Sequence, residues 1–168
     1  AFTTGSDCEI VSALYRKDGP AAFAKLNGIF AFALWDAQAQ RVVIARDPLG
    51  VCPLYWGHDA DGRLWVASEM KAIVRVCPDV ALFPPGHWYD GATGELVRFH
   101  QRDWRDYDAT RGVSVTPAAL RGALESAVHR QLMSDVPYGV LLSGGLDSSI
   151  VAACAGPPAR RRAEGADR

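Results

Sequence analysis

The spacing of apolar and polar positions divides the first hundred residues into a short helical start and a longer strand-rich part. Ser6 and Glu9 stand at the spacing of a capping box, and apolar residues follow at helical spacing over 10–14. Residues 29–35 are apolar throughout, which is typical of a strand covered on both faces, and residues 42–45 are its expected hairpin partner. The remaining pattern predicts short strands over 53–57, 63–67, 87–89 and 95–99, and short helices over 21–26 and 69–76.

The pattern changes again after residue 100. Residues 101–115 are polar, follow neither period and are predicted to be a linker. Thr116 and Pro117 then have the N-cap and first-turn proline that are typical of a helix start, and one helical face stays apolar as far as Leu132. Residues 138–142 predict a short buried strand, which is followed by a glycine-containing loop and the start of another helix.

The end of the chain lacks the side chains that a folded core needs. Residues 155–168 contain no apolar side chain larger than alanine, together with two prolines, two glycines and four arginines. Such a segment is predicted to be a disordered tail. The whole pattern therefore predicts a first domain over 1–100, a linker over 101–115, the start of a second domain over 116–154, and the tail.

Composition excludes several classes of protein. With 168 residues, 49% of them hydrophobic and 22% charged, the chain has the composition of a folded protein. A formal net charge of -1 argues against a general nucleic-acid or anionic-membrane binder, and no apolar run approaches the roughly 18 residues of a membrane span. The four cysteines form no C-x-x-C pair, so neither a zinc site nor a disulfide framework is indicated. Because the chain starts at Ala1 without a signal peptide, we interpret it as an internal segment of a longer cytoplasmic protein.

The loop after the predicted strand 138–142 carries the clearest chemical signal. Gly144 and Gly145 let the backbone turn, and the first amides of the following helix would point back at the turn and attract an anion. Ser143 and Ser148 add hydroxyl groups, and Asp147 suits a magnesium ion that bridges phosphate oxygens. The loop has no lysine and is not a Walker A motif. A serine-capped glycine turn without a ligand is the alternative interpretation.

Two groups of motifs resemble one family. Ser143-Gly-Gly-Leu-Asp-Ser148 is similar to the pyrophosphate loop of the ATP-pyrophosphatase enzymes, and with residues 132–142 it resembles the glutamine-hydrolysing asparagine synthetases. The N-terminal part resembles the class II glutamine amidotransferase domain of the same enzymes, through residues 5–9, 28–36, 46–50, 53–55 and 68–72. The resemblance runs from about Phe2 to Ala153.

This resemblance implies a fold class and a reaction. The implied fold is α+β: part of an Ntn-hydrolase αββα layered amidotransferase domain, then the start of an α/β adenine-nucleotide alpha hydrolase-like (ATP-pyrophosphatase) domain. In this family the thiol of an N-terminal cysteine hydrolyses glutamine, and ammonia passes inside the protein to the second domain. There ATP and Mg²⁺ convert aspartate to β-aspartyl-AMP, and ammonia attacks it to give asparagine, AMP and pyrophosphate.

The resemblance also assigns residues. Asp7 matches the acidic residue that binds the α-ammonium group of glutamine, and Leu142 matches a position that lies against the nucleotide. The pyrophosphate loop comprises Ser143, Gly144, Gly145, Leu146, Asp147 and Ser148, with Asp147 as the expected metal ligand. No catalytic residue is expected in this chain, because the nucleophilic cysteine would precede Ala1 and Cys8 falls inside the capping sequence of a helix. Arg46 and Asp47 are expected to brace a turn rather than touch substrate.

Three functions stay open at this point. The first is asparagine synthesis by the full-length parent, with glutamine, aspartate and ATP as substrates and this chain inactive alone. The second is a related amidotransferase and adenylating synthetase with a different acceptor acid, and the third is a non-catalytic scaffold remnant. No nucleic-acid or membrane partner is expected, and a homodimer of the parent is one option. We expect the loop to be poorly supported, because a parallel strand needs neighbours and cover on both faces.

Overall fold

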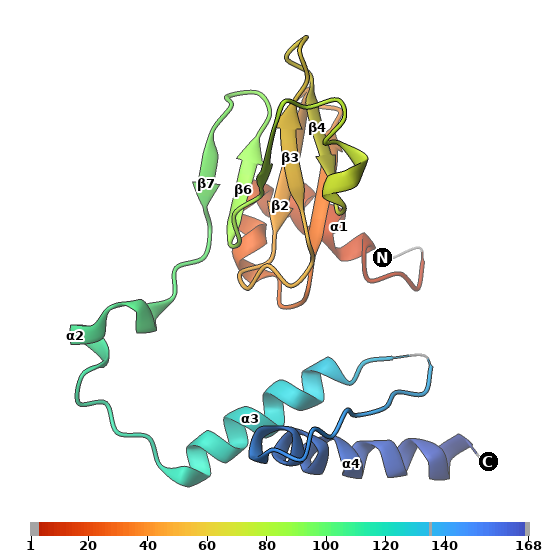
Figure 1. The fold of residues 1–168 in the computed structure, drawn as a ribbon, viewed down its shortest axis with the longest axis vertical. Coiled ribbons are helices and arrows are strands. Elements are labelled where there is room, and N and C mark those ends of the chain that lie inside the picture. The colour runs from red at the N-terminus through yellow and green to blue at the C-terminus, as the bar shows by residue number, and fades with distance from the viewer. Residues whose placement is uncertain (1–3, 135, 167–168) are drawn as a thin grey trace. The chain divides into compact units, whose positions relative to one another are not determined.

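The computed structural model describes residues 4–134 and 136–166 (Figure 1). The chain divides into two compact units, residues 1–105 and 106–168, so the division falls inside the predicted linker. Each unit is described by itself. Among the described residues, no helix combines the length and the apolar character needed to cross a membrane.

The first unit is strand-dominated, as predicted. Its elements are α1 (Glu9–Asp18), the 3-10 helix η1 (Gly19–Lys25), β1 (Ala31–Asp36), β2 (Arg41–Arg46), β3 (Tyr55–His58), β4 (Leu64–Ala67), the 3-10 helix η2 (Met70–Ala72), β5 (Asp79–Leu82), β6 (His87–Asp90), β7 (Leu96–Arg98) and the 3-10 helix η3 (Asp103–Arg105). All six predicted strands are present, whereas β5 was not predicted. The two short helices expected over 21–26 and 69–76 form as 3-10 helices.

The strands form two antiparallel sheets that lie face to face. One sheet has the order β1-β2-β6-β7 and the other has the order β4-β3-β5. The predicted hairpin is confirmed, with Ala31 paired to Arg46 and Asp36 paired to Arg41 at its two ends. The first sheet packs one face against α1 and η1 and the other face against the second sheet, which gives three layers (Figure 1).

The alternation of side chains explains why β2 is apolar on both of its faces. Phe32 on β1 and Val43 on β2 point to the helical layer, where they join a cluster around Tyr15 and Phe23. Ile44, one residue further along β2, points to the opposite face and packs in a cluster with Leu54 and Phe83. Because both faces of β2 are covered, both sets of its positions must be apolar. The cover expected on both faces of residues 29–35 is only partial, since Ala33 and Trp35 of β1 are exposed.

Two charged side chains, Arg46 and Asp47, lie in the core at the end of β2, and they are only 4% and 1% exposed. The Arg46 guanidinium donates hydrogen bonds to the carbonyl oxygens of Gly50 and Cys52, both at 2.8 Å, and to that of Phe83 at 2.6 Å. Phe83 directly follows β5 of the second sheet. Arg46 therefore ties the end of β2 to the turn after it and to the neighbouring sheet.

The Asp47 carboxylate holds the turn that follows β2. Its oxygens accept hydrogen bonds from the backbone N–H groups of residues 49–52, at distances from 2.7 to 3.3 Å. The N–H of Gly50 also lies 3.1 Å from the carbonyl oxygen of Asp47, which closes the turn expected from the sequence. The expectation that Arg46 and Asp47 brace this turn is confirmed.

The second unit is helical. It contains α2 (Tyr107–Thr110), α3 (Pro117–Gln131) and α4 (Leu146–Ala166). The predicted helix start is confirmed, because the Thr116 hydroxyl accepts a hydrogen bond from the Ala119 N–H at 3.2 Å. The short helix α2 forms inside the predicted linker, where the Asp106 carboxylate caps it by accepting from two backbone N–H groups.

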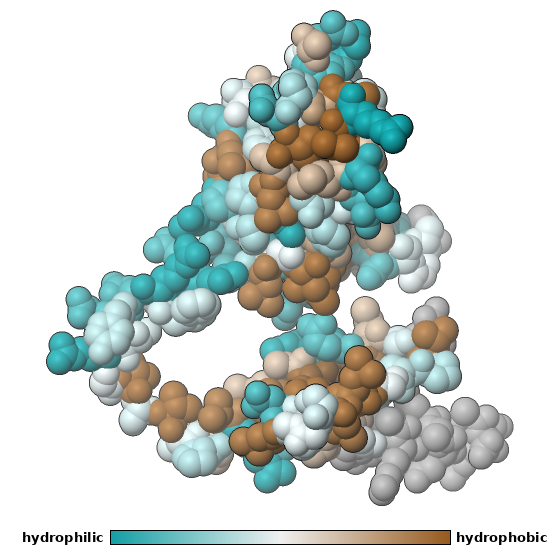
Figure 2. All heavy atoms as spheres, viewed as in Figure 1, coloured by the Kyte–Doolittle hydropathy of each residue, from teal (hydrophilic) through white to brown (hydrophobic). Residues whose placement is uncertain are grey.

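The predicted buried strand over 138–142 is wrong. The described residues of the second unit contain no strand, and residues 139–142 are non-helical backbone without a ladder partner. Leu141 is 95% exposed and Leu142 is 65% exposed, and Figure 2 shows apolar side chains at the surface of this unit. An isolated apolar segment cannot become a strand until a neighbour accepts and donates its backbone hydrogen bonds.

The predicted disordered tail also differs from the structure. The helix α4 continues from the loop as far as Ala166, so residues 155–166 are helical, while residues 167–168 lie outside the described residues. The segment lacks large apolar side chains but is rich in alanine and arginine. Both favour helix without needing a core, even though the segment contains two prolines.

We expect the Asp47→Asn variant to lose about 3 kcal/mol in its free energy of unfolding, because an amide NH₂ group would face backbone N–H groups that need an acceptor. Urea unfolding followed by circular dichroism measures this loss. The matched control is Asp61→Asn, whose carboxylate is 65% exposed and whose loss should stay below about 0.5 kcal/mol. Equal losses in the two variants would show that the Asp47 carboxylate does not hold the turn.

Candidate functional site

The glycine-serine loop, defined here as Ser143–Ser148, leads directly into α4. Gly144 has a φ of +83°, in the region that favours glycine, and α4 begins two residues later at Leu146. A Cβ atom added at Gly144 would meet nothing within 4 Å, so the backbone conformation and not lack of space requires glycine here. The turn predicted from the two glycines is therefore present in the structure.

The backbone at this turn leaves several donors without an acceptor. The first hydrogen bond of the helix runs from the Ser149 N–H to the Gly145 carbonyl oxygen at 3.2 Å. Among the described residues, none accepts a hydrogen bond from the N–H groups of residues 144–148. These amides, together with the positive end of the helix dipole, make the loop a suitable site for an anion such as a pyrophosphate group.

The serine hydroxyls hold the shape of the loop. The hydroxyl oxygens of Ser143 and Ser148 lie 3.0 Å apart, so one donates to the other across the turn. The Ser148 and Ser149 hydroxyls both donate to the Gly145 carbonyl oxygen, at 3.1 and 2.8 Å. The three serines close the loop on itself; Ser143 is exposed to solvent, where a ligand could reach it, and Ser148 is half-buried.

Asp147 lies in the first turn of α4 and is exposed. Within the described part of the chain, no group of three or more histidine, cysteine, aspartate and glutamate side chains could hold a metal ion. A magnesium ion at this place would therefore take one carboxylate from Asp147 and its other ligands from phosphate oxygens and water, which is how Mg²⁺ commonly binds beside a nucleotide.

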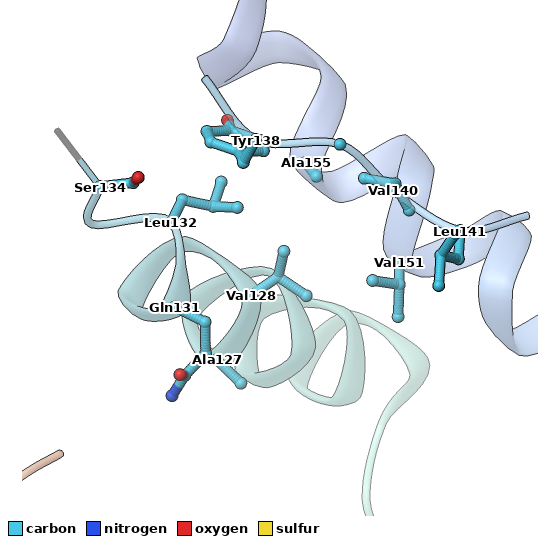
Figure 3. Close-up of a pocket in the computed structure, with 11 residues that line it drawn as sticks. Ala127, Val128, Gln131, Leu132, Ser134, Tyr138, Val140, Leu141, Val151 and Ala155 are labelled. Carbon is cyan, nitrogen blue, oxygen red and sulfur yellow. The ribbon is translucent and has the colours of Figure 1, made fainter. Parts of the chain in front are cut away.

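A cavity of about 640 Å³ lies in the second unit, between α3, α4 and the segment that precedes the loop (Figure 3). Three valine side chains project into it: Val128 from α3, Val140 from the segment before the loop, and Val151 from α4. The described residues that line it belong to α3, to α4 and to the segment between Leu132 and Leu141, and none belongs to the glycine-serine loop. The sequence did not predict this cavity, because its apolar residues follow the same pattern as the core of a helix pair.

Asp7 lies in the turn before α1 and is exposed. Its backbone carbonyl accepts a hydrogen bond from the Ile10 N–H at 3.1 Å, so the residue is attached to the first turn of the helix. The N-cap is Cys8 and not Ser6 as the capping-box spacing suggested; the Ser6 hydroxyl instead accepts from the Cys8 N–H at 3.3 Å. The Asp7 carboxylate is thus available at a helix start, where the dipole favours a negative charge.

The predicted site residues fall into two candidate sites, one in each unit. Asp7 belongs to the first unit, and the glycine-serine loop with Leu142 belongs to the second. Leu142 directly precedes the loop and is 65% exposed, which leaves its side chain open to contact. The structure brings the loop residues together in the way the sequence suggested, and it does not bring Asp7 into the same unit.

Comparisons with known proteins agree with this division. A family model described as glutamine amidotransferase domain matches residues 1–93, and a second model described as asparagine synthase matches residues 119–164. Among solved structures, the glutamine phosphoribosylpyrophosphate amidotransferase from B. subtilis has a TM-score of 0.52 at 23% identity, over 93% of this chain and 39% of that chain. This likeness confirms the predicted fold class of an amidotransferase.

Curated relatives extend over nearly the whole chain. Asparagine synthetase B [glutamine-hydrolyzing] of Escherichia coli is 51% identical over 99% of this chain, and the match covers 30% of that protein. A probable asparagine synthetase of Schizosaccharomyces pombe is 46% identical over 92% of this chain, with 28% of that protein covered. The chain therefore spans about 30% of the length of the relatives it matches. Because the amidotransferase model covers more than half of the chain, the chain belongs to the glutamine amidotransferase domain family, and over nearly its whole length it is similar to glutamine-hydrolysing asparagine synthetases.

Proposed function

We propose that the protein of which this chain is part makes asparagine from aspartate, with ammonia from glutamine and with ATP as the activating substrate. The observation that carries this proposal is the glycine-serine loop. Its free amides, those of residues 144–148, lie at the start of α4, in the region matched by the asparagine synthase model. A loop of this kind can bind the two phosphate groups of ATP that leave together as pyrophosphate. The same chain also carries the amidotransferase unit that the use of glutamine requires. A cytoplasmic location and a homodimer are part of this proposal.

Each group in the loop has a distinct role in the proposed reaction. The N–H groups of residues 144–148 bind the phosphate oxygens that leave as pyrophosphate, and they stabilise the charge that develops there. The hydroxyls of Ser143 and Ser148 donate to the same oxygens once they turn from each other to the ligand. Asp147 would hold a magnesium ion, whose positive charge would offset the negative charge of the phosphate groups. Leu142 contacts the nucleotide through its exposed side chain.

Asp7 has a role in the first unit. We assign its carboxylate to the α-ammonium group of glutamine, because a charge-assisted hydrogen bond of this kind fixes both position and orientation. Neither Asp7 nor any other residue of this chain is proposed as the nucleophile. Cys8 serves as the N-cap of α1, so its backbone is committed to the helix start.

A labelling experiment tests the proposed function. The full-length gene product is incubated with ATP–Mg²⁺, aspartate and glutamine that carries ¹⁵N in its side-chain amide. We expect the label in the side-chain amide of asparagine, with release of AMP and pyrophosphate. Label in a different amide would contradict aspartate as the acceptor, and absence of label from every product would contradict an amidotransferase function.

Replacement of Gly144 by alanine tests the loop itself. Alanine disfavours a φ of +83°, so the Gly144→Ala variant should change the backbone turn and misalign the free amides. We expect the KM for ATP in the labelling assay to rise about tenfold, which corresponds to about 1.4 kcal/mol of lost binding. Gly122→Ala is the matched control, because Gly122 lies within α3 with nothing within 4 Å of an added Cβ. An unchanged KM in Gly144→Ala would exclude the loop from the ATP site.

The 168-residue chain by itself should bind ATP–Mg²⁺ only weakly. The loop is formed, but the segment before it has no strand partner and Leu141 is 95% exposed. We therefore expect a dissociation constant well above about 100 μM by isothermal titration calorimetry, since mobile loop amides lose entropy when they bind. Micromolar binding would show that the loop needs no support from a sheet.

A further inference from the structure

Tyr15 is the most deeply buried residue of helix α1, and residues 11–14 are half-buried. Of the ten residues of α1, all of which the structure describes, only Tyr15 is buried. Its ring stacks on Phe23 of η1, with the ring centroids 5.9 Å apart and an angle of 10° between the planes. This stacking and the contacts of the half-buried residues 11–14 are not directional, so they hold the helix against the unit without fixing its rotation.

Hydrogen bonds at the Tyr15 hydroxyl are directional, so they restrict the rotation of α1 in a way that ring stacking does not. The hydroxyl donates to the Asp36 carboxylate at 2.8 Å and accepts from the Arg41 guanidinium at 3.0 Å. Arg41 in turn donates to the Asp90 carboxylate at 2.5 Å. Asp36 ends β1, Arg41 begins β2 and Asp90 ends β6, so the hydroxyl ties α1 to three strand ends of one sheet.

The charges around the hydroxyl keep each group in one protonation state. Burial raises the pKa of the Tyr15 hydroxyl, and the hydrogen bond to Asp36 adds to this, so the group stays a donor at neutral pH. The backbone N–H of Ala39 and the Tyr15 hydroxyl both lower the pKa of Asp36, which stays an acceptor. The hydrogen bond to Tyr15 raises the pKa of Arg41. The direction of every bond in the network is therefore fixed.

We propose that Tyr15, Asp36 and Arg41 are positioning residues that aim Asp7 at glutamine, an inference that rests on the proposed function. Glu9 and Tyr15 are six residues apart, which is about 9 Å along the helix. Asp7 follows the first turn of α1 through its hydrogen bond to the Ile10 N–H. A rotation of α1 about the Tyr15 ring therefore displaces the Asp7 carboxylate, and the hydroxyl network prevents that rotation.

The Tyr15→Phe variant tests this role, because it keeps the stacked ring and removes only the hydroxyl. In glutaminase assays of the full-length gene product, we expect the KM for glutamine to rise about fivefold while kcat stays within about twofold. Tyr107→Phe is the matched control: it loses the same hydroxyl from a side chain that is 73% exposed. A KM equal to that of the wild type, or a loss confined to kcat, would overturn the proposal.

Amide hydrogen exchange separates this inference from the function on which it rests. In Tyr15→Phe of the 168-residue chain, we expect faster exchange over residues 11–14 of α1 and unchanged exchange in β2, compared with the wild type. Unchanged exchange in α1 would refute the anchoring by the hydroxyl whatever the activity. Absence of glutaminase activity in the wild-type gene product would instead refute the proposed function, and with it the role of the anchor in binding glutamine.

Discussion

The first unit depends on two charged side chains that are buried at the end of β2. Burial of Arg46 and Asp47 is tolerated only because each finds partners for its donors or acceptors, and the backbone around them needs those partners equally. The Gly86 N–H contacts the carbonyl oxygens of both residues, at 3.2 and 3.1 Å, and Arg102 donates to the Pro48 carbonyl oxygen at 2.7 Å. One small polar centre therefore joins the first sheet, the turn, the second sheet and the chain that leaves β7.

The sequence predicted most of this unit because the main strands of its first sheet carry apolar side chains on both faces, although Ala33 and Trp35 of β1 are exposed. Apolar runs such as residues 29–35 then appear as strands without any knowledge of their partners. The strand β5 could not be predicted in this way, because most of its side chains are exposed and its pattern resembles a loop. The turn around Asp47 was predictable from local chemistry, whereas the hydrogen bond from Arg46 to Phe83 joins residues 37 positions apart and left no pattern in the sequence.

The candidate sites show the same distinction between local and distant causes. The turn at Gly144 and the start of α4 follow from the residues of the loop itself, so the sequence predicted them. The strand before the loop requires neighbours, and the pattern of residues 138–142 could not reveal whether those neighbours are present. The Tyr15 network was also hidden, because Tyr15 and Asp36 are separated by 21 positions and Arg41 and Asp90 by 49.

The magnitudes indicate what controls the loop in the second unit. A charge at a helix N-terminus is stabilised by only about 0.3–1 kcal/mol when it is exposed. Leu141 and Leu142 precede the loop and Leu146 lies in it, and they are 95%, 65% and 76% exposed. Complete burial of a leucine side chain contributes about 2 kcal/mol, so a cover over the exposed part of these three side chains would add roughly 5 kcal/mol. Packing around the loop, more than the chemistry of its amides, therefore determines whether the amides are held rigidly enough to bind a nucleotide.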